Sequence, residues 1–320
     1  MTVNIEGDKL FCLDSETGDT IWHYQEASYD CRQMAVFRGD VITVNRDNEL
    51  VALDCTTGDV SYTLPSLDAG YDRTNKERVI DETITGFALG GNIIVLVSEG
   101  GTLQAINLET KTRQWTSTLP QSLNYGEPCA DRNSLYYPGV ALDAYSLHDG
   151  HSVWQSCIGG KPLSPMCSIF NNSILAVSGD VLARIDTADG ETRWQTTLNG
   201  PVQSPPIATG DNVYALTLAA KGKPELYLHK LRLREGDTLW VHVLDEEGST
   251  SGRQLFLNGV LYILGLSGKL HAISAENGSG LATYDTRHTA SDSNVLNAGN
   301  WIFMGNAHGV YKITAFESTN

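Results

Sequence analysis

The chain has 320 residues, of which 41% are apolar and 19% are charged, and its formal net charge is −16. This composition is too apolar for a disordered chain. The surplus of carboxylates argues against a nucleic-acid partner, because such partners are bound by a basic surface that neutralises phosphates. No apolar run is long enough for a membrane helix, so membrane insertion is not expected. A chain of this length could hold two or three ordinary domains unless it is built of repeats.

The N-terminus, residues 1–8, has neither the basic region nor the apolar region of a signal peptide. A cytoplasmic location is therefore favoured, and a periplasmic or secreted one stays open if the chain was trimmed. The six cysteines include no Cys-x-x-Cys pair, so we expect core thiols rather than disulfides or a zinc site. The eight histidines show no His-x-x-x-His spacing, and no metal site is predicted.

A repeat runs along the whole chain. Its first copy, residues 10–22, reads Leu-Phe-Cys-Leu-Asp-Ser-Glu-Thr-Gly-Asp-Thr-Ile-Trp, and the second copy is residues 50–62. Further copies follow at residues 103–115, 142–154, 182–194, 228–240 and 270–282, with a partial copy from Val310. The glycine of the repeat stands at Gly18, Gly58, Gly150, Gly190, Gly236 and Gly278, and Lys111 replaces it in the third copy.

Each part of the repeat has a physical role. The Leu-x-Ala-Leu-Asp segment is typical of a short buried β-strand, the Asp can accept backbone N–H bonds in the next turn, and the glycine allows a positive φ. The aromatic residue four positions after the glycine is expected to dock between neighbouring repeats, with its polar group bonded to the neighbour. These structural docking residues are Trp22, Tyr62, Trp115, Trp154, Trp194 and Trp240, and Ala282 leaves the last position empty.

Two more strands are expected between successive hairpins, which gives four short strands in each repeat of roughly 40 residues. This pattern is typical of a β-propeller blade. The chain is therefore predicted to be all-β: one domain over residues 1–320, an eight-bladed β-propeller of four-stranded antiparallel blades. In a seven-bladed alternative, residues 20–24 would complete the sheet of residues 289–313. The six complete sets of strands are expected to begin at Cys31, Val79, Tyr125, Leu163, Val202 and Ser251.

Two insertions interrupt the repeat, at residues 65–78 and 219–224. In a propeller the loops in these two positions emerge on the same face, so they could form the binding surface for a protein or peptide partner. Tolerated surface insertions remain the other interpretation. Asp245-Glu246-Glu247 is expected to be a solvated acidic turn.

The starts of the first strands should line the mouth of a central channel. Mixed basic, acidic and amide side chains in such a concavity could bind a small polar ligand or a peptide, although an ordinary hydrated channel is the favoured interpretation. The residues in these positions are Arg32, Gln33, Glu127, Ser164, Ser204, Arg253, Gln254, Asp292 and Asn294, with His288 nearby.

The Ala-x-Asp-x-x-Thr-Gly-x-x-x-Trp frame resembles the PQQ-like repeat of the quinoprotein alcohol dehydrogenase-like superfamily. The same repeat occurs in the lipoprotein of the outer-membrane β-barrel assembly machinery and in related scaffold propellers. The resemblance covers the whole chain and implies the propeller fold. The adjacent cysteine pair that quinoprotein dehydrogenases hold beside their cofactor is missing here. A PQQ-dependent dehydrogenase is therefore not expected, and no cofactor and no catalytic residue are assigned.

Two functions follow as hypotheses. The first is a non-enzymatic binding or scaffolding propeller, because the repeated residues serve packing between blades and no catalytic set is visible. The second is an enzyme or small-ligand sensor at the channel mouth, with Arg32, Glu127, Arg253, Asp292 and His288 as its candidate residues.

Overall fold

The structure is a computed structural model, and it describes residues 2–6, 9–28, 33–65, 83–119, 126–159, 163–164, 166–219, 224–247, 250, 254–286, 295–306 and 309–316. All regular elements among these residues are β-strands. The described part of the chain thus has no helix long and apolar enough to cross a membrane.

The chain forms two compact units. The N-terminal unit consists of residues Val3–Asp14 and Asp19–Cys157, and the C-terminal unit consists of Met1–Thr2, Ser15–Gly18 and Ile158–Asn320. Four sheets belong mainly to the N-terminal unit. They are β1 (Thr2–Glu6), β2 (Lys9–Leu13) and β3 (Thr20–Tyr24); β4 (Ala35–Phe37), β5 (Asp40–Val44), β6 (Leu50–Asp54) and β7 (Val60–Leu64); β8 (Ile84–Gly90), β9 (Ile93–Ser98), β10 (Thr102–Asn107) and β11 (Thr112–Thr118); and β12 (Cys129–Ala130), β13 (Ser134–Pro138), β14 (Leu142–Ser146) and β15 (Ser152–Ser156).

Four further sheets belong to the C-terminal unit. They are β16 (Cys167–Phe170), β17 (Ser173–Ser178), β18 (Val181–Asp186) and β19 (Thr192–Thr197); β20 (Ile207–Thr209), β21 (Asn212–Ala219), β22 (Glu225–Arg232) and β23 (Thr238–Glu247); β24 (Leu255–Leu257), β25 (Val260–Leu264), β26 (Lys269–Ser274) and β27 (Gly280–Asp285); and β28 (Val295–Ala298), β29 (Trp301–Asn306) and β30 (Gly309–Thr314).

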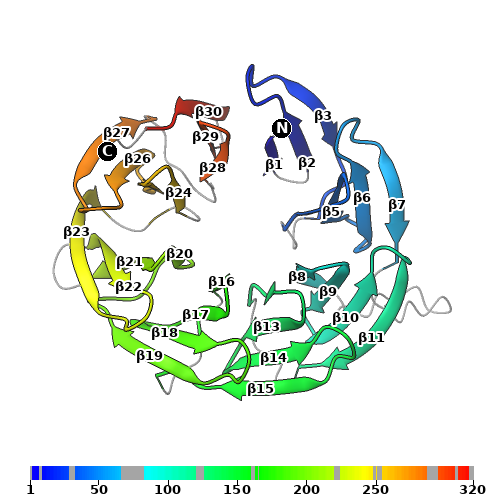
Figure 1. Cartoon of the computed structure of the whole chain (residues 1–320). Helices are drawn as coiled ribbons and strands as arrows, with labels where there is room; N and C mark the ends of the chain where they lie inside the picture. Colours follow the sequence, from blue (N-terminus) through cyan, green and yellow to red (C-terminus); the bar gives the residue numbers. More distant parts are fainter. Residues whose placement is uncertain are drawn as a thin grey trace. The chain divides into compact units, whose positions relative to one another are not determined.

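Within every described sheet the strands lie side by side in chain order and pair antiparallel (Figure 1). The first and last sheets have three strands and the other six have four, as the repeat predicts for the described residues. Eight such sheets define an eight-bladed β-propeller, which confirms the predicted fold class. The seven-bladed alternative is wrong, because β3 pairs with β2 of its own sheet, with Trp22 opposite Cys12.

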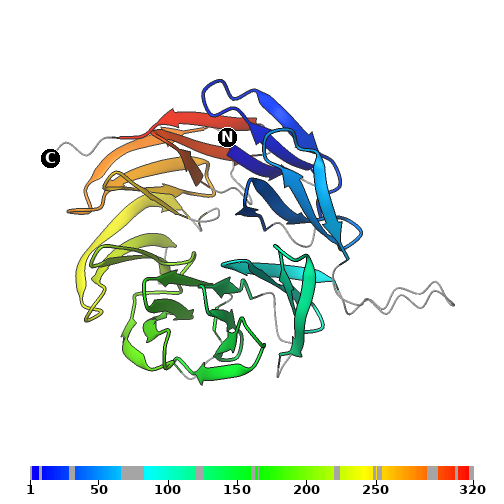
Figure 2. The same cartoon turned by 45° about the vertical axis from the view of Figure 1, so that its right-hand side comes forward.

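The first strands begin later than the sequence suggested. β20 starts at Ile207 rather than at Val202, and Val202 instead makes an isolated bridge to Thr217. Pro205 and Pro206 lie between the bridge and the strand, and proline has no N–H to contribute to a ladder. The same sheet is seen from a second side in Figure 2, where its two long strands β22 and β23 run beside each other.

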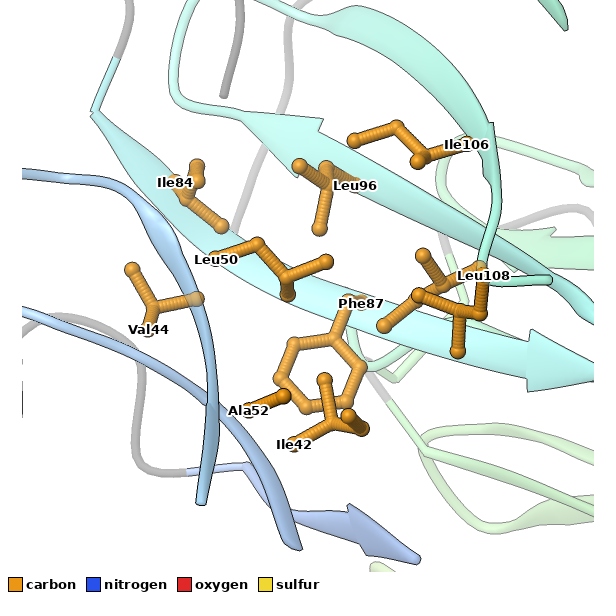
Figure 3. Close-up of a cluster of buried hydrophobic side chains, with 10 residues drawn as sticks. Ile42, Val44, Leu50, Ala52, Ile84, Phe87, Leu96, Ile106 and Leu108 are labelled. Carbon is orange, nitrogen blue, oxygen red and sulfur yellow. The ribbon is translucent and has the colours of Figure 1, made fainter. Parts of the chain in front are cut away.

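The hydrophobic core consists of clusters between neighbouring sheets. In the N-terminal unit, Ile42, Val44, Leu50 and Ala52 from β5 and β6 pack against the next sheet (Figure 3). The side chains that meet them from the next sheet, all buried, are Ile84, Phe87, Ile94, Leu96, Ile106 and Leu108. The middle strands are apolar on both faces because each face is covered by a neighbouring sheet. The repeat residues therefore build the joints between sheets.

Candidate functional site

Four repeat tryptophans donate the indole N–H to a backbone carbonyl in the turn of the next sheet. The Nε1–O distances are 3.0 Å for Trp22 to Cys55, 2.8 Å for Trp115 to Leu147, 2.7 Å for Trp194 to Leu233 and 3.1 Å for Trp240 to Glu276. The ring of Trp154 lies 5.7 Å from the ring of Tyr136, measured between centroids. The four hydrogen bonds connect neighbouring sheets, whereas Trp154 and Tyr136 stand in the same sheet. Both kinds of contact serve the architecture of the fold.

The turn glycine lies directly under the docking ring. Gly58 has φ +76°, and a Cβ placed on it would lie 2.6 Å from Cγ of Trp22. At Gly150, with φ +75°, a Cβ would lie 2.5 Å from Cε3 of Trp115. Glycine is therefore required here for two separate reasons, the left-handed backbone and the space that the ring occupies.

One joint departs from this rule on both of its sides. Tyr62 stands at the docking position where five repeats have tryptophan, and the turn that follows it has Lys111 in place of glycine. Lys111 keeps the left-handed backbone, with φ +57°. Its ammonium lies 4.0 Å from the centroid of the Tyr62 ring, which is a cation–π contact. The two exceptions therefore meet in space and form an alternative joint.

The aspartate of the repeat is committed to its own turn. Oδ1 of Asp54 accepts hydrogen bonds from the backbone N–H groups of Thr56 and Thr57, at 2.8 and 3.0 Å. The bonds from Thr57 and then Thr56 hold the pKa of this carboxyl below its usual range. Asp186 makes the equivalent bond to Ala188 N, at 3.0 Å. These carboxylates stabilise turns and are poorly suited to proton transfer near neutral pH.

Five of the ten residues predicted for the channel mouth lie in the described part of the chain, and they fall in different units. Gln33 and Glu127 belong to the N-terminal unit, and Ser164, Ser204 and Gln254 belong to the C-terminal unit. Gln33 is half-buried, Glu127 is exposed and Gln254 is buried. The other five positions, Arg32, Arg253, His288, Asp292 and Asn294, lie outside the described residues.

Gln33 and Gln254 use their side chains to connect neighbouring sheets. Oε1 of Gln33 accepts a hydrogen bond from the backbone N–H of Phe87, in β8. The same Oε1 atom, and Cδ of Pro128, lie 3.3 and 3.2 Å from the point where a Cβ on Gly86 would stand. Nε2 of Gln254 donates to the Pro205 carbonyl at 3.3 Å. The two glutamines thus contribute to the joints between sheets.

Two buried atoms in this region have no hydrogen-bond partner among the described residues, Oε1 of Gln254 and Oγ of Ser204. The carbonyl of Pro205 can only accept, so it fixes the amide of Gln254 with the nitrogen towards Pro205 and the oxygen away from it. A buried acceptor without a donor is unfavourable by about 1–3 kcal/mol. This pair therefore offers hydrogen bonds to a water molecule or a polar ligand.

The sequence did not indicate a buried carboxylate–imidazole network between β23 and β26. Oε2 of Glu246 lies 3.2 Å from Nε2 of His271 and accepts from Oγ of Ser267 at 2.8 Å. Oε1 of Glu246 accepts from the Ser267 N–H at 3.1 Å. Nδ1 of His271 lies 3.4 Å from Oγ1 of Thr283. The expected acidic turn at 245–247 is thus wrong: the segment continues β23, and strand alternation turns Glu246 inward.

A second buried polar cluster lies in the sheet of β20 to β23. Nε2 of His229 is 2.8 Å from Oδ1 of Asn199 and 3.0 Å from Oγ1 of Thr217. Burial lowers the pKa of His229 to about 4, so its imidazole is neutral at pH 7. Oγ1 of Thr217 also donates to Oδ1 of Asn199, at 2.6 Å. Every described member of the cluster is occupied by the others, which identifies a structural network.

A cavity of about 720 Å³ lies between this sheet and the next one, near the C-terminal segment. Lys230, Tyr214, Phe256 and Phe316 line it. Nζ of Lys230 donates to the Ala275 carbonyl at 2.8 Å and to the Glu276 carbonyl at 3.2 Å, and burial lowers its pKa. Lys230 stands where most repeats have Cys or Ala, and Arg184 stands at the same position in the preceding repeat. Since its ammonium already donates to two carbonyls of the next sheet's turn, the main role of Lys230 is to connect the two sheets.

The described residues contain no group of three or more His, Cys, Asp or Glu side chains arranged to hold a metal ion. Of the five cysteines in the described segments, all of them thiols, Cys12 and Cys167 are buried and Cys157 is exposed. The expectation of core thiols thus holds for two of these residues. Burial raises the pKa of the Cys12 thiol.

Repeats, sheet topology and docking contacts together define the class: the protein is an eight-bladed β-propeller of PQQ-like repeats. A family model described as "Outer membrane protein assembly factor BamB" matches residues 1–156 and 139–315, and the chain belongs to this family.

Similar proteins agree with this assignment. The outer membrane protein assembly factor BamB of Yersinia pestis is 21% identical over an alignment of 211 residues. The match covers 59% of this chain and 53% of the relative, so it spans about half of that relative's length. The crystal structure of BamB from Moraxella catarrhalis superposes with a TM-score of 0.72 at 15% identity, covering 98% of this chain and 96% of that one. Quinohemoprotein alcohol dehydrogenase from Comamonas testosteroni gives a TM-score of 0.71 at 13% identity, covering 94% and 68%. At these identities the structural likeness shows the fold alone.

Proposed function

We propose that the chain is a non-enzymatic scaffold, a single propeller domain over residues 1–320 that binds another protein during the assembly of outer-membrane proteins. The observation that carries this proposal is the family match over nearly the whole chain, to an outer membrane protein assembly factor. The fold likeness to BamB of Moraxella catarrhalis over 96% of that chain supports it.

The use of the repeat residues supports the same proposal. The docking tryptophans donate to carbonyls of the next sheet, and the aspartates accept from their own turns. Gln33 and Gln254, candidates for the channel mouth, bond to the backbone of Phe87 in β8 and of Pro205 before β20. A scaffold needs this rigid framework and presents its specificity on loops and edges.

The insertions at 65–78 and 219–224 are the proposed partner face. Pro65, Ala219 and Pro224 are described, and residues 66–78 and 220–223 lie outside the described part of the chain. The proposal for this face therefore rests on the positions of the insertions in the repeat.

Affinity capture from the native host, with chemical cross-linking and mass spectrometry, tests the proposal. We expect cross-links from residues 65–78 or 219–224 to one partner, and loss of that partner when residues 66–78 are replaced by a Gly/Ser linker of equal length. Thr110→Ala, in an exposed turn between β10 and β11, is the matched control and should retain the partner. Capture of no protein above empty resin by the native chain would overturn the scaffold proposal.

The small-ligand alternative at the channel mouth is favoured by one observation, the unsatisfied Oε1 of Gln254 and Oγ of Ser204. A polar metabolite that donates to Gln254 should raise the melting temperature of the native chain. It should leave that of Gln254→Leu unchanged, because the acceptor is gone. A metabolite panel without effect on the native chain would contradict this alternative. Arg32, Glu127, Arg253, Asp292 and His288 remain its proposed further residues.

A further inference from the structure

The outer strand β23 carries a row of exposed apolar side chains. Leu239 is 42% exposed, Val241 is 47% exposed and Val243 is 49% exposed. They alternate along the strand with Trp240 and Leu244, which pack towards the neighbouring sheet. The solvent-exposed face of this strand is thus apolar, as is typical of a surface that another protein covers.

The other outer strands provide an internal comparison. Val241 and Val243 stand one and three residues after the docking tryptophan, and β23 is the one described outer strand with apolar side chains at both positions. The equivalent pairs are His23 and Gln25, Thr63 and Pro65, Thr116 and Thr118, Gln155 and Cys157, Gln195 and Thr197, and Thr283 and Asp285. The pair Val241 and Val243 is therefore a local feature of this sheet, whereas the position of Leu239 is also apolar in other repeats, at Ile21, Val153 and Leu281.

The backbone of β23 is also suited to pairing. β23 is the last strand of its sheet and, among the described strands, pairs with β22 alone. Its register against β22 is regular from Trp240 to Leu244, between two irregularities. In an edge strand every second residue directs its N–H and C=O away from the sheet, and charges or bulges normally protect such an edge. Here the regular stretch coincides with Val241 and Val243.

Charge decides which occupant fits. The row ends in exposed carboxylates, Asp237 on one side and Asp245 on the other. If a second copy paired with β23 antiparallel about Val241, Asp237 would come near Asp245 at both ends, and like charges opposite each other are destabilising. A shift of two residues would place Asp245 opposite Val241, a carboxylate against an apolar side chain. The edge therefore favours a strand with basic ends over its own copy.

We propose that β23 is a docking edge for an extended segment of a partner protein, which adds a strand beside residues 240–244. The segment places apolar side chains at alternate positions over Val241 and Val243, and carries Lys or Arg near Asp237 and Asp245. This inference rests on the proposed scaffold function and names the chemistry of a partner and a second surface for it. Strand addition of this kind takes its affinity from main-chain hydrogen bonds and its specificity from alternate side chains.

A labelled peptide, Lys-Thr-Val-Thr-Val-Thr-Val-Thr-Lys, tests the edge directly by fluorescence anisotropy with the native chain. We expect saturable binding that weakens as salt is added, and that is about tenfold weaker for the double variant Val241→Thr/Val243→Thr. Threonine keeps the β-branched shape, so the strand itself should persist. The control is Leu281→Thr in β27, an equally exposed apolar residue on another outer strand, which should leave binding unchanged.

Two outcomes would overturn the docking edge. One is equal binding of the native chain and the double variant. The other is equal binding of a peptide with Glu in place of both Lys, because the charge argument would then be wrong. Hydrogen exchange of the native chain needs no variant: the peptide should protect amides of residues 240–244 and leave those of 280–285 unchanged. A concentration-dependent dimer that Val241→Thr/Val243→Thr abolishes would show a second copy as the occupant instead.

The failures of the two proposals are distinguishable. If the native chain captures its partner and the double variant captures it equally well, the edge proposal fails and the scaffold proposal stands. If the peptide protects residues 240–244 while the native chain captures no partner, the edge is real and the scaffold proposal fails.

Discussion

The ring of Trp194 lies directly against Gly236 of the following sheet, so that a Cβ added to Gly236 would be 2.6 Å from Cδ2 and Cε3 of the ring. The indole N–H of Trp194 meanwhile donates to the carbonyl of Leu233, three residues earlier in the same turn. Trp194 thus packs against Gly236 and donates a hydrogen bond to Leu233 of the same turn. The tightness of this joint explains why so many repeats share the same two residue types.

Gly236→Ala should lower the free energy of unfolding more than Gly18→Ala. Both glycines have a positive φ, +77° and +80°, so alanine strains the backbone by about 1–2 kcal/mol at each. Of the two, Gly236 faces a ring, whereas no described residue lies within 4 Å of a Cβ at Gly18. The clash should add about 1–3 kcal/mol, measured by denaturant unfolding. Equal losses in the two variants would show that the ring yields freely.

Trp194→Phe and Trp194→Ala should separate the hydrogen bond from the packing. Trp194 is 9% exposed. Phenylalanine loses the bond to Leu233 and part of the ring, so we expect a loss of about 1–2 kcal/mol. Alanine leaves a cavity, so we expect about 3–5 kcal/mol. Comparing the acrylamide quenching of the native chain with that of Trp194→Phe isolates the fluorescence of this tryptophan, and rapid quenching of that component would contradict the docking role.

Glu246→Ala should destabilise the chain strongly while Asp245→Ala should not. Glu246 is 5% exposed and accepts from Ser267 and His271, whereas the adjacent Asp245 is exposed. Loss of the carboxylate leaves buried donors without an acceptor, which we expect to be unfavourable by about 3–5 kcal/mol. The surface change should stay within about 0.5 kcal/mol. Melting curves that coincide for the two variants would exclude the network as a stabilising element.

Acid should weaken the native chain through His229. Its pKa is about 4 in the folded state because burial disfavours the charged imidazole, against an ordinary value near 6.5. Below pH 6.5 His229 becomes protonated in the unfolded chain but stays neutral in the folded chain. The free energy of unfolding therefore falls as the pH drops from about 6.5 to 4. The full effect is about 3 kcal/mol. His229→Gln should lack this component; parallel pH–stability curves for the two proteins would refute it.

The eight sheets could be predicted because the signal is periodic. A strand, a glycine turn and a tryptophan recur with fixed spacing, and their contacts are local or lie one repeat away, so the sequence repeat maps directly onto sheets. The polar clusters could not be predicted in this way. Glu246 and His271 are far apart in sequence and join only because β23 extends to Glu247, which a run of three acidic residues concealed.

The candidate site was harder to predict for a related reason. A position at the start of a strand predicts that a residue lies near the channel mouth, but it does not reveal what the amide of that residue bonds to. Gln33 bonds to the backbone of Phe87 in β8, and Gln254 bonds to the backbone of Pro205, which precedes β20. The exposed valines of β23 were visible in the sequence, but their meaning depends on knowing that none of the six other described outer strands has apolar side chains of this kind at both places.

The joint between Tyr62 and Lys111 has a consequence for how such chains recombine. Each docking residue and the turn residue that it contacts lie in different copies of the repeat. Whether the two residues fit together therefore depends on a pair of neighbouring copies and not on one copy alone. A sheet bearing Tyr62 could be grafted beside a glycine turn only at the loss of its cation partner, and a tryptophan grafted beside Lys111 would meet a side chain where it needs a bare backbone. The natural unit of exchange in this architecture therefore runs from the middle of one repeat to the middle of the next.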